Sequence, residues 1–289
     1  MFSLKKILLP VDFSERSLGA ARYAEALAEQ LDCEITMLHV LPTPHYEFTA
    51  LEGGGMMLGE YYGTRKVAIE QELEQFLRTE LPRLKATRLM LEGDPATRIA
   101  AEAEKGFDLI VMPTHGYGPF RRFVLGSVTA KVLHDAHCPV WTGAHLETAP
   151  AVEKIHFQTV MAAVDLGPES EKALHWAHEF AARHGAKLIL AHATPSLEGR
   201  TGEYFDPNWR TYMATQAKER LDGLQAKAGT NAELAIEAGD AHYVVCDLAK
   251  SHQADLVVIG RGSVAGVFGR LRASAYGIIR QSPCPVVSV

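Results

Sequence analysis

The feature that most constrains this chain is an internal duplication. Residues 7–15 (ILLPVDFSE) recur as residues 160–168 (VMAAVDLGP), and residues 108–112 (DLIVM) recur as residues 255–259 (DLVVI). Each copy later reaches a Cys-Pro-Val sequence, at 138–140 and at 284–286. Two copies of one pattern in the same order must fold into two similar units, so the chain is read as a tandem repeat.

The spacing between the copies locates an insertion. Asp12 and Asp165 are 153 residues apart, whereas Pro139 and Pro285 are 146 apart, so the first copy has seven extra residues between positions 40 and 93. The sequence Glu-Gly-Gly-Gly at 52–55 lies in this interval and predicts a mobile loop. Whether the segment 52–62 closes over a binding site stays open.

Length and charge limit the domain organisation and the class of partner. A chain of 289 residues suits two domains, which we place at 1–145 and 155–289 with a linker at 146–154. The net charge of −6 disfavours nucleic-acid binding, because polyanion-binding proteins are usually basic. No apolar run approaches the roughly 20 residues of a membrane span, so we expect a soluble, cytoplasmic protein that binds no membrane.

The cysteines are expected to be reduced thiols. Cys138 and Cys284 occupy equivalent places in the two copies, and Cys33 and Cys246 are isolated, with no Cys-x-x-Cys spacing.

Strand and helix patterns alternate along both copies, which predicts an α/β fold with doubly wound parallel sheets of five strands. Apolar runs predict strands at 7–11, 34–40, 88–92, 109–113 and 140–143, then at 158–164, 187–193, 232–237, 255–260 and 285–289. Helices are predicted at 17–31, 65–81, 96–105 and 127–136, then at 169–184, 208–228, 241–252 and 273–281. Ser14 or Asp12 can cap the first helix, and Asp94 precedes Pro95 at the start of the third.

Ligands of such folds bind beyond the carboxyl ends of the strands, at the point where the winding direction reverses. That rule selects residues 10–14, Val40 and the loop after Met112. In this loop, Gly126 and Ser127 open a helix, whose N-terminal amides and dipole favour phosphate oxygens.

Charge favours an anion at both loops. The first copy has no acidic residue from Leu109 to His134, and the second has none from Leu256 to its end. Basic residues occur in both stretches, at Arg121, Arg122 and Lys131, and at Arg261, Arg270, Arg272 and Arg280.

These residues resemble the universal stress protein family in its tandem two-domain form. The resemblance covers essentially the whole chain and rests on the Pro-x-Asp turn at 10–12, the DLIVM strand, and the Gly-x-x-Gly-(nine residues)-Gly-Ser/Thr loop. It implies two sheets of the adenine nucleotide alpha hydrolase-like type, each with strand order 3-2-1-4-5. It also implies that the last strands pair across a pseudo-twofold axis, so that the chain is an intramolecular pseudo-dimer that can form a homodimer of chains.

The resemblance further implies an adenine nucleotide site, chiefly in the first domain. Adenine and ribose would lie near Pro10, Val11, Asp12, Val40 and Met112. The phosphates would lie near Thr114, Gly116, Arg121, Arg122, Gly126, Ser127 and Val128, with ATP, ADP or AMP as the ligand and Mg²⁺ carried by the phosphates. Pro113 stands where the family has its first glycine, so three of four signature positions match.

The second copy departs further from the family signature. Gly260 is present, but Ser263 and Ala273 replace the second and third glycines, and the Cβ of Ala273 is expected to crowd a phosphate. We therefore expect at most a weak second site, formed by Asp165, Gly260, Ser263 and Ser274.

Other interpretations remain open. Asp12 and Asp165 also suit helix caps, Gly126-Ser127 suits an ordinary helix start, and Arg121, Arg122 and Arg270 suit a surface or the contact between copies. The equivalent His39 and His192 are expected to be structural, since no side-chain set suggests a metal site.

No catalytic motif is found, so we do not expect an enzyme. The sequence thus favours a stress-response protein that binds nucleotide and acts through a conformational change or an unknown protein partner. The alternatives are an interaction scaffold with both sites degenerate and a slow ATPase.

Overall fold

The structure is a computed structural model that describes residues 4–43, 55–115, 125–143, 149–195, 209–261 and 273–289. The strands of the first half are β1 (Lys6–Pro10), β2 (Glu34–Leu41), β3 (Ala86–Glu92), β4 (Leu109–Val111) and β5 (Val140–Thr142). Those of the second half are β6 (Thr159–Ala163), β7 (Lys187–Thr194), β8 (Glu233–Ala238), β9 (Leu256–Ile259) and β10 (Val286–Ser288).

All ten strands form one sheet, in the order β3-β2-β1-β4-β5-β10-β9-β6-β7-β8. Each half has the predicted order 3-2-1-4-5, and pairing within each half is parallel. β5 and β10 pair antiparallel, with Trp141 opposite Val287. The two predicted sheets are therefore halves of a continuous sheet related by a pseudo-twofold axis.

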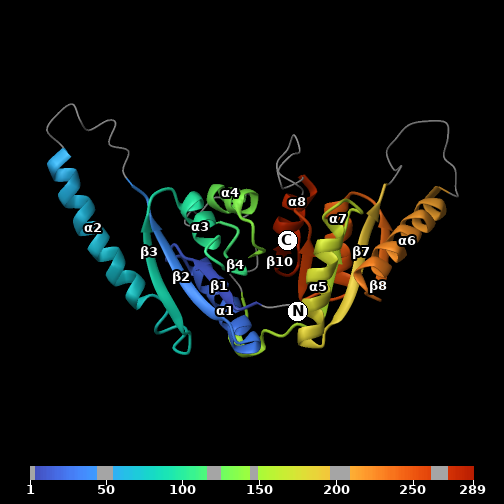
Figure 1. Cartoon of the computed structure of the whole chain (residues 1–289), viewed down its shortest axis with the longest axis horizontal. Helices are drawn as coiled ribbons and strands as arrows, with labels where there is room; N and C mark the ends of the chain where they lie inside the picture. The colour runs from blue at the N-terminus through green and yellow to red at the C-terminus, as the bar shows by residue number, and fades with distance from the viewer. Residues whose placement is uncertain (1–3, 44–54, 116–124, 144–148, 196–208, 262–272) are drawn as a thin grey trace.

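Helices cover both faces of this sheet (Figure 1). One face packs against α1 (Glu15–Leu31), α2 (Gly55–Gln75), α5 (Ser170–His184) and α6 (Trp209–Ala228). The other packs against α3 (Pro95–Ala103), α4 (Ser127–Asp135), α7 (Ala241–Ser251) and α8 (Ala273–Gln281). A 3₁₀ helix, η3 (Val152–Lys154), lies between the halves. Among the described helices, none is long and apolar enough to cross a membrane.

The strands are apolar along nearly their whole length because helices cover both faces of the sheet. Along β1, Ile7 and Leu9 are buried against one layer of helices, and Leu8 is buried against the other. Since side chains alternate between the faces of a strand, both sets must be apolar when both faces are covered.

The halves meet over an aromatic cluster on the face that α1 and α5 cover. Trp141 of β5 is fully buried, and its ring lies 5.8 Å from Tyr23, 5.5 Å from Phe157 and 5.9 Å from Phe180. The first two of these four residues come from the first half and the other two from the second. Apolar packing therefore spans the junction.

The second helix differs from its prediction at both ends. It begins at Gly55, so the described part of the predicted 52–62 loop is helical, and residues 44–54 lie outside the described residues. Met56, Met57 and Leu58 are good helix formers, which explains the extension. The helix ends at Gln75, before Leu81, because Leu77 has a φ of 62° that an α-helix does not accept.

Candidate functional site

A cavity of about 260 Å³ opens at the carboxyl ends of β1, β2 and β4, where the winding direction reverses. It brings together six predicted residues from three strand ends and the first turn of α4: Pro10, Val11, Asp12, Val40, Met112 and Val128. This is the position that the strand-end rule selects.

Pro113, which the sequence placed at a signature position, also lines the cavity. Sequence reasoning did not assign eight further lining residues to the site: Ser17, Leu38, His39, Pro42, Pro95, Ile99, His115 and Thr129. Pro95 and Ile99 come from α3, whose N-cap Asp94 was recognisable in the sequence. That cap could have indicated a second helix N-terminus at the cavity. The remaining walls depend on which strands become neighbours.

Asp12 is held by the first turn of α1. Its Oδ1 accepts hydrogen bonds from the Ser14 N–H (3.2 Å), the Ser14 Oγ (2.6 Å) and the Ser17 Oγ (2.7 Å). Ser14 itself is the N-cap of α1 and accepts from the Ser17 amide. Asp12 therefore supports the cap and lines the cavity as well, so the two interpretations of this residue are compatible.

His39 lies at the end of β2, with its Nδ1 2.9 Å from the Val11 carbonyl oxygen. Because a carbonyl only accepts, Nδ1 carries the proton and Nε2 is the basic nitrogen of the neutral ring. The ring stacks on Phe13 at 4.4 Å. Burial lowers the pKa of His39, and the bond to Val11 partly opposes that shift. The neutral histidine is a wall of the cavity.

The N-terminus of α4 closes another side of the cavity. Its N-cap Gly126 donates its amide to the Thr114 carbonyl (2.8 Å), and the first helical bond runs from Ala130 N to Gly126 O (2.8 Å). Amides 127–129 therefore lack acceptors within the helix, as at any helix start. Such amides attract an anion.

Gly126 lies close to the preceding loop and does not have an unusual backbone angle. Its φ is −62°, but a Cβ at this position would lie 3.1 Å from the His115 Cα and 3.3 Å from the Thr114 carbonyl oxygen. The preceding loop of the protein is therefore one close neighbour of Gly126, and the expected proximity of its amide to phosphates stays a prediction.

The other predicted residues of the first site lie around the cavity or outside the described chain. Thr114 is buried, and its Oγ1 lies 2.9 Å from His115 Nδ1. Ser127 is exposed, and Thr114, Gly126 and Ser127 do not line the cavity. Gly116, Arg121 and Arg122 lie outside the described residues.

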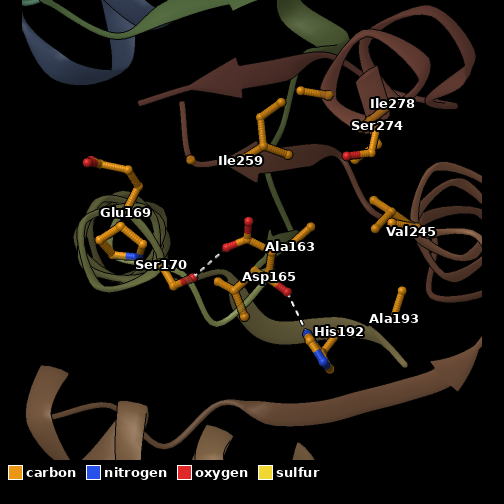
Figure 2. Close-up of a pocket in the computed structure, with 15 residues that line it drawn as sticks. Ala163, Asp165, Glu169, Ser170, His192, Ala193, Val245, Ile259, Ser274 and Ile278 are labelled. Atoms are coloured by element: carbon orange, nitrogen blue, oxygen red, sulfur yellow. Dashed lines mark hydrogen bonds between the residues drawn. The ribbon is translucent and has the colours of Figure 1, made fainter. Parts of the chain in front are cut away.

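An equivalent cavity of about 210 Å³ lies in the second half (Figure 2). It includes the predicted Asp165, Gly260 and Ser274, whereas Ser263 lies outside the described residues. Asp165 Oδ1 accepts from the Gly167 amide (2.8 Å) and from Ser170 Oγ (3.2 Å). His192 Nδ1 lies 2.7 Å from the Val164 carbonyl, as His39 does from Val11. The duplication therefore extends to the polar groups of the cavity.

Two differences make the second cavity less suited to phosphate. Glu169 lines it at the position that Arg16 occupies in the first copy, and a Cβ on Gly260 would lie 3.1 Å from the Glu169 Cβ. Arg261, one of the basic residues expected to face an anion, does not line this cavity, whereas Arg270 and Arg272 lie outside the described residues. Arg261 is buried, and its guanidinium donates to the carbonyls of Leu133, Ala136 and Cys138 in the first half.

No group of three or more potential metal-binding side chains occurs among the described residues. The four cysteines are free thiols. Burial raises the pKa of Cys138 to about 11 and that of Cys284 to about 12, which disfavours the reactive thiolate.

Residues 3–142 and 156–289 each match the model of the universal stress protein family. A universal stress protein of Mycolicibacterium smegmatis is 26% identical over 295 residues, covering 98% of this chain and 96% of that protein. One from Methanocaldococcus jannaschii is 35% identical over 137 residues, covering 47% of this chain and 79% of that protein. The crystal structure of a universal stress protein from Archaeoglobus fulgidus aligns with a TM-score of 0.70 at 23% identity, covering 99% of this chain and 98% of that one.

Proposed function

The chain belongs to the universal stress protein family, and on this premise we propose that it binds an adenine nucleotide, ATP, chiefly in the cavity of the first half. Its biological output is then a change of conformation or of partner binding that depends on the bound nucleotide. Mg²⁺ enters with the phosphate oxygens, which are hard ligands that this ion prefers.

The observation that carries the proposal is the juxtaposition of an apolar cavity with the N-terminus of α4. Val40, Ile99 and Met112 provide apolar walls for a planar base. Val128 and Thr129 belong to the first turn of α4, whose amides favour an anionic group. A nucleotide has an apolar face and an anionic tail, so it matches both parts of the cavity.

Asp12 is the polar residue best placed to select the ligand. Its Oδ1 is held by Ser14 and Ser17 in a fixed orientation. A carboxylate accepts hydrogen bonds from hydroxyl and amino groups, both of which a nucleoside carries. In the second half, Asp165 accepts hydrogen bonds from the Gly167 amide and from Ser170 Oγ. The lining residue Glu169 adds a negative charge near this cavity, which disfavours a polyphosphate.

A slow ATPase is the weaker alternative. The lining residues Ser17 and Asp12 form a hydroxyl–carboxylate pair, but this pair belongs to the first turn of α1, where Asp12 also accepts from Ser14. Positioning of a triphosphate at a helix start suffices for binding alone. An interaction scaffold without nucleotide is the alternative from another class. The scaffold alternative is weaker because it gives the first cavity no function.

The test fills each cavity separately in the full chain. Val128 and Ala275 follow directly on Gly126-Ser127 and Ala273-Ser274, and each lines its own cavity. We expect Val128→Trp to weaken ATP binding at least about tenfold, by occupying the space of the ligand, whereas Ala275→Trp leaves the main binding event unchanged. Isothermal titration calorimetry with ATP and Mg²⁺ measures both.

Three results would contradict the proposal or change its class. Wild-type protein that binds no nucleotide, in titration and in mass spectrometry of the purified protein, favours the scaffold. Equal losses in the two variants contradict the assignment to the first half. Steady phosphate release above a protein-free control, lost in Asp12→Ala, favours the ATPase.

A further inference from the structure

Arg261 makes a buried contact from the second half into the first. Its side chain follows β9, is 5% exposed, and reaches the end of α4. Nη1 lies 2.9 Å from the Ala136 oxygen and 3.4 Å from the Leu133 oxygen, and Nη2 lies 2.6 Å from the Cys138 oxygen. The last carbonyls of a helix have no partners within it, so Arg261 completes the C-terminus of α4.

The backbone of Arg261 is fixed as well. Its amide donates to the Val289 carbonyl at 2.8 Å, beside β10. A cation at the negative end of a helix dipole is also electrostatically favourable. The guanidinium therefore holds α4 from an anchored position in the second half.

Among the described residues, the corresponding position of the first copy makes no such contact with the second half. The residue of the first copy that corresponds to Arg261 is Thr114, which follows Pro113 as Arg261 follows Gly260. The Thr114 hydroxyl bonds within its own half, 2.9 Å from His115 Nδ1. Only the first half thus has a site helix held by an arginine of its neighbour at this position.

The opposite end of α4 lines the first cavity. α4 has nine residues, so about 13 Å separates its ends at 1.5 Å per residue. Within the first half, α4 is tied to α3 by Lys131 Nζ, 2.9 Å from Asp94 Oδ1, and to the preceding loop by Thr129 Oγ1, 3.0 Å from the Pro113 oxygen. Lys131 and Asp94 are about half exposed, and an exposed pair restrains weakly. At the far end of α4, Val132 and Leu133 are fully buried in the core, and Arg261 adds buried, charge-assisted hydrogen bonds to the last carbonyls.

We propose that Arg261 is a positioning residue for the nucleotide site of the first half. By holding the C-terminus of α4, it fixes the orientation of the helix amides 127–129 that face the phosphates. This inference rests on the proposed nucleotide binding, and it makes the site of one half dependent on a side chain of the other.

The test compares Arg261→Met with Arg22→Met in the full chain. Both changes remove a guanidinium and retain an apolar stem, but Arg22 of α1 bonds to the Ala149 carbonyl at 2.6 Å and lines neither cavity. We expect Arg261→Met to weaken ATP binding about fivefold to tenfold, because charge-assisted hydrogen bonds to α4 are lost. Arg22→Met should leave the dissociation constant within about twofold of the wild type.

Hydrogen exchange without nucleotide provides a second, independent measurement. Amides 130–136 of α4 should exchange at least about fivefold faster in Arg261→Met than in the wild type. In Arg22→Met, their exchange rates should equal those of the wild type. Arg261→Lys, which retains the charge but not the two-nitrogen fork, should fall between wild type and Arg261→Met in both measurements.

The outcomes separate the two proposals. Unchanged exchange in α4 overturns the positioning role, whether or not nucleotide binds. Faster exchange in α4 with an unchanged ATP affinity shows that Arg261 positions α4 but does not influence the nucleotide site of the first half. If the wild type binds no nucleotide, the proposed function fails, and faster exchange still supports the positioning of α4.

Discussion

Single residues at the strand ends serve the fold and the cavity together. Asp12 supports the cap of α1 and lines the first cavity, and Asp165 lines the second cavity and accepts hydrogen bonds from the Gly167 amide and from Ser170 at the start of α5. Substitution of either aspartate therefore lowers stability as well as any ligand binding. Cavity-filling variants such as Val128→Trp test the site more directly, because they leave these caps intact.

His39 predicts a pH dependence of stability. Its pKa is lowered by burial from the ordinary 6.5, so the unfolded state gains a proton first as the pH falls. The stability present above pH 6.5 should therefore be lost progressively below it. We expect His39→Asn, whose amide can still donate to the Val11 carbonyl, to reduce the loss of unfolding free energy between pH 7 and pH 5.

Urea unfolding at several pH values measures this effect. The comparison uses the slopes against pH, since the variant also loses the stacking on Phe13. Some slope should remain, because burial also lowers the pKa of His184. A variant as sensitive to acid as the wild type would show that His39 does not titrate differently on folding.

At the scale of the element, the two copies end their first helix differently. Asp32 is the C-cap of α1 with a φ of 58°, and its counterpart Gly185 is the C-cap of α5 with a φ of 62°. Glycine adopts positive φ without strain, whereas aspartate does so at a cost. An acidic group at a helix C-terminus is also disfavoured by the dipole.

We therefore expect opposite effects from the reciprocal substitutions. Asp32→Gly should raise the free energy of unfolding by about 0.5 to 1 kcal/mol, and Gly185→Asp should lower it by a similar amount. No atom lies within 4 Å of a Cβ on Gly185, so steric overlap does not complicate the result. Thermal and urea unfolding measure both variants, and changes of the same sign would refute the explanation.

At the scale of the whole molecule, the β5–β10 pairing and the aromatic cluster join the two halves into one structure. Trp141→Ala should lower the free energy of unfolding by about 3 to 5 kcal/mol, because it leaves a cavity in the cluster. Trp141→Phe keeps an aromatic ring and removes an indole N–H without a hydrogen-bond partner in the described structure. It should cost less than about 1.5 kcal/mol.

These variants also test whether the halves unfold together. The chain has three tryptophans, and without Trp141 the other two, Trp176 and Trp209, report on the second half alone. Tryptophan fluorescence and far-ultraviolet circular dichroism should then give coincident transitions, both shifted to lower urea in Trp141→Ala. A second-half transition that remains at its wild-type midpoint would indicate independent domains.

The sequence alone determined the repeat, the alternation of strands and helices, and the edge of the sheet where the two candidate cavities lie. These features depend on patterns within a few residues: apolar runs in the strands, and caps such as Asp94 at helix starts. Two copies of such a pattern restrict the fold strongly. The domain boundaries at 145 and 155 stay predictions.

Only the tertiary structure decided which side chains meet. It assigned His39, Pro95 and Ile99 to the first cavity and explained Gly126 by its contact with the His115 backbone. It also turned Arg261 from an expected anion ligand into a link to α4. Arg261 and Ala136 are 125 residues apart, so their contact depends on how the two halves join across β5 and β10. Local sequence patterns do not encode such distances, because a partner that far along the chain is fixed by the assembled sheet.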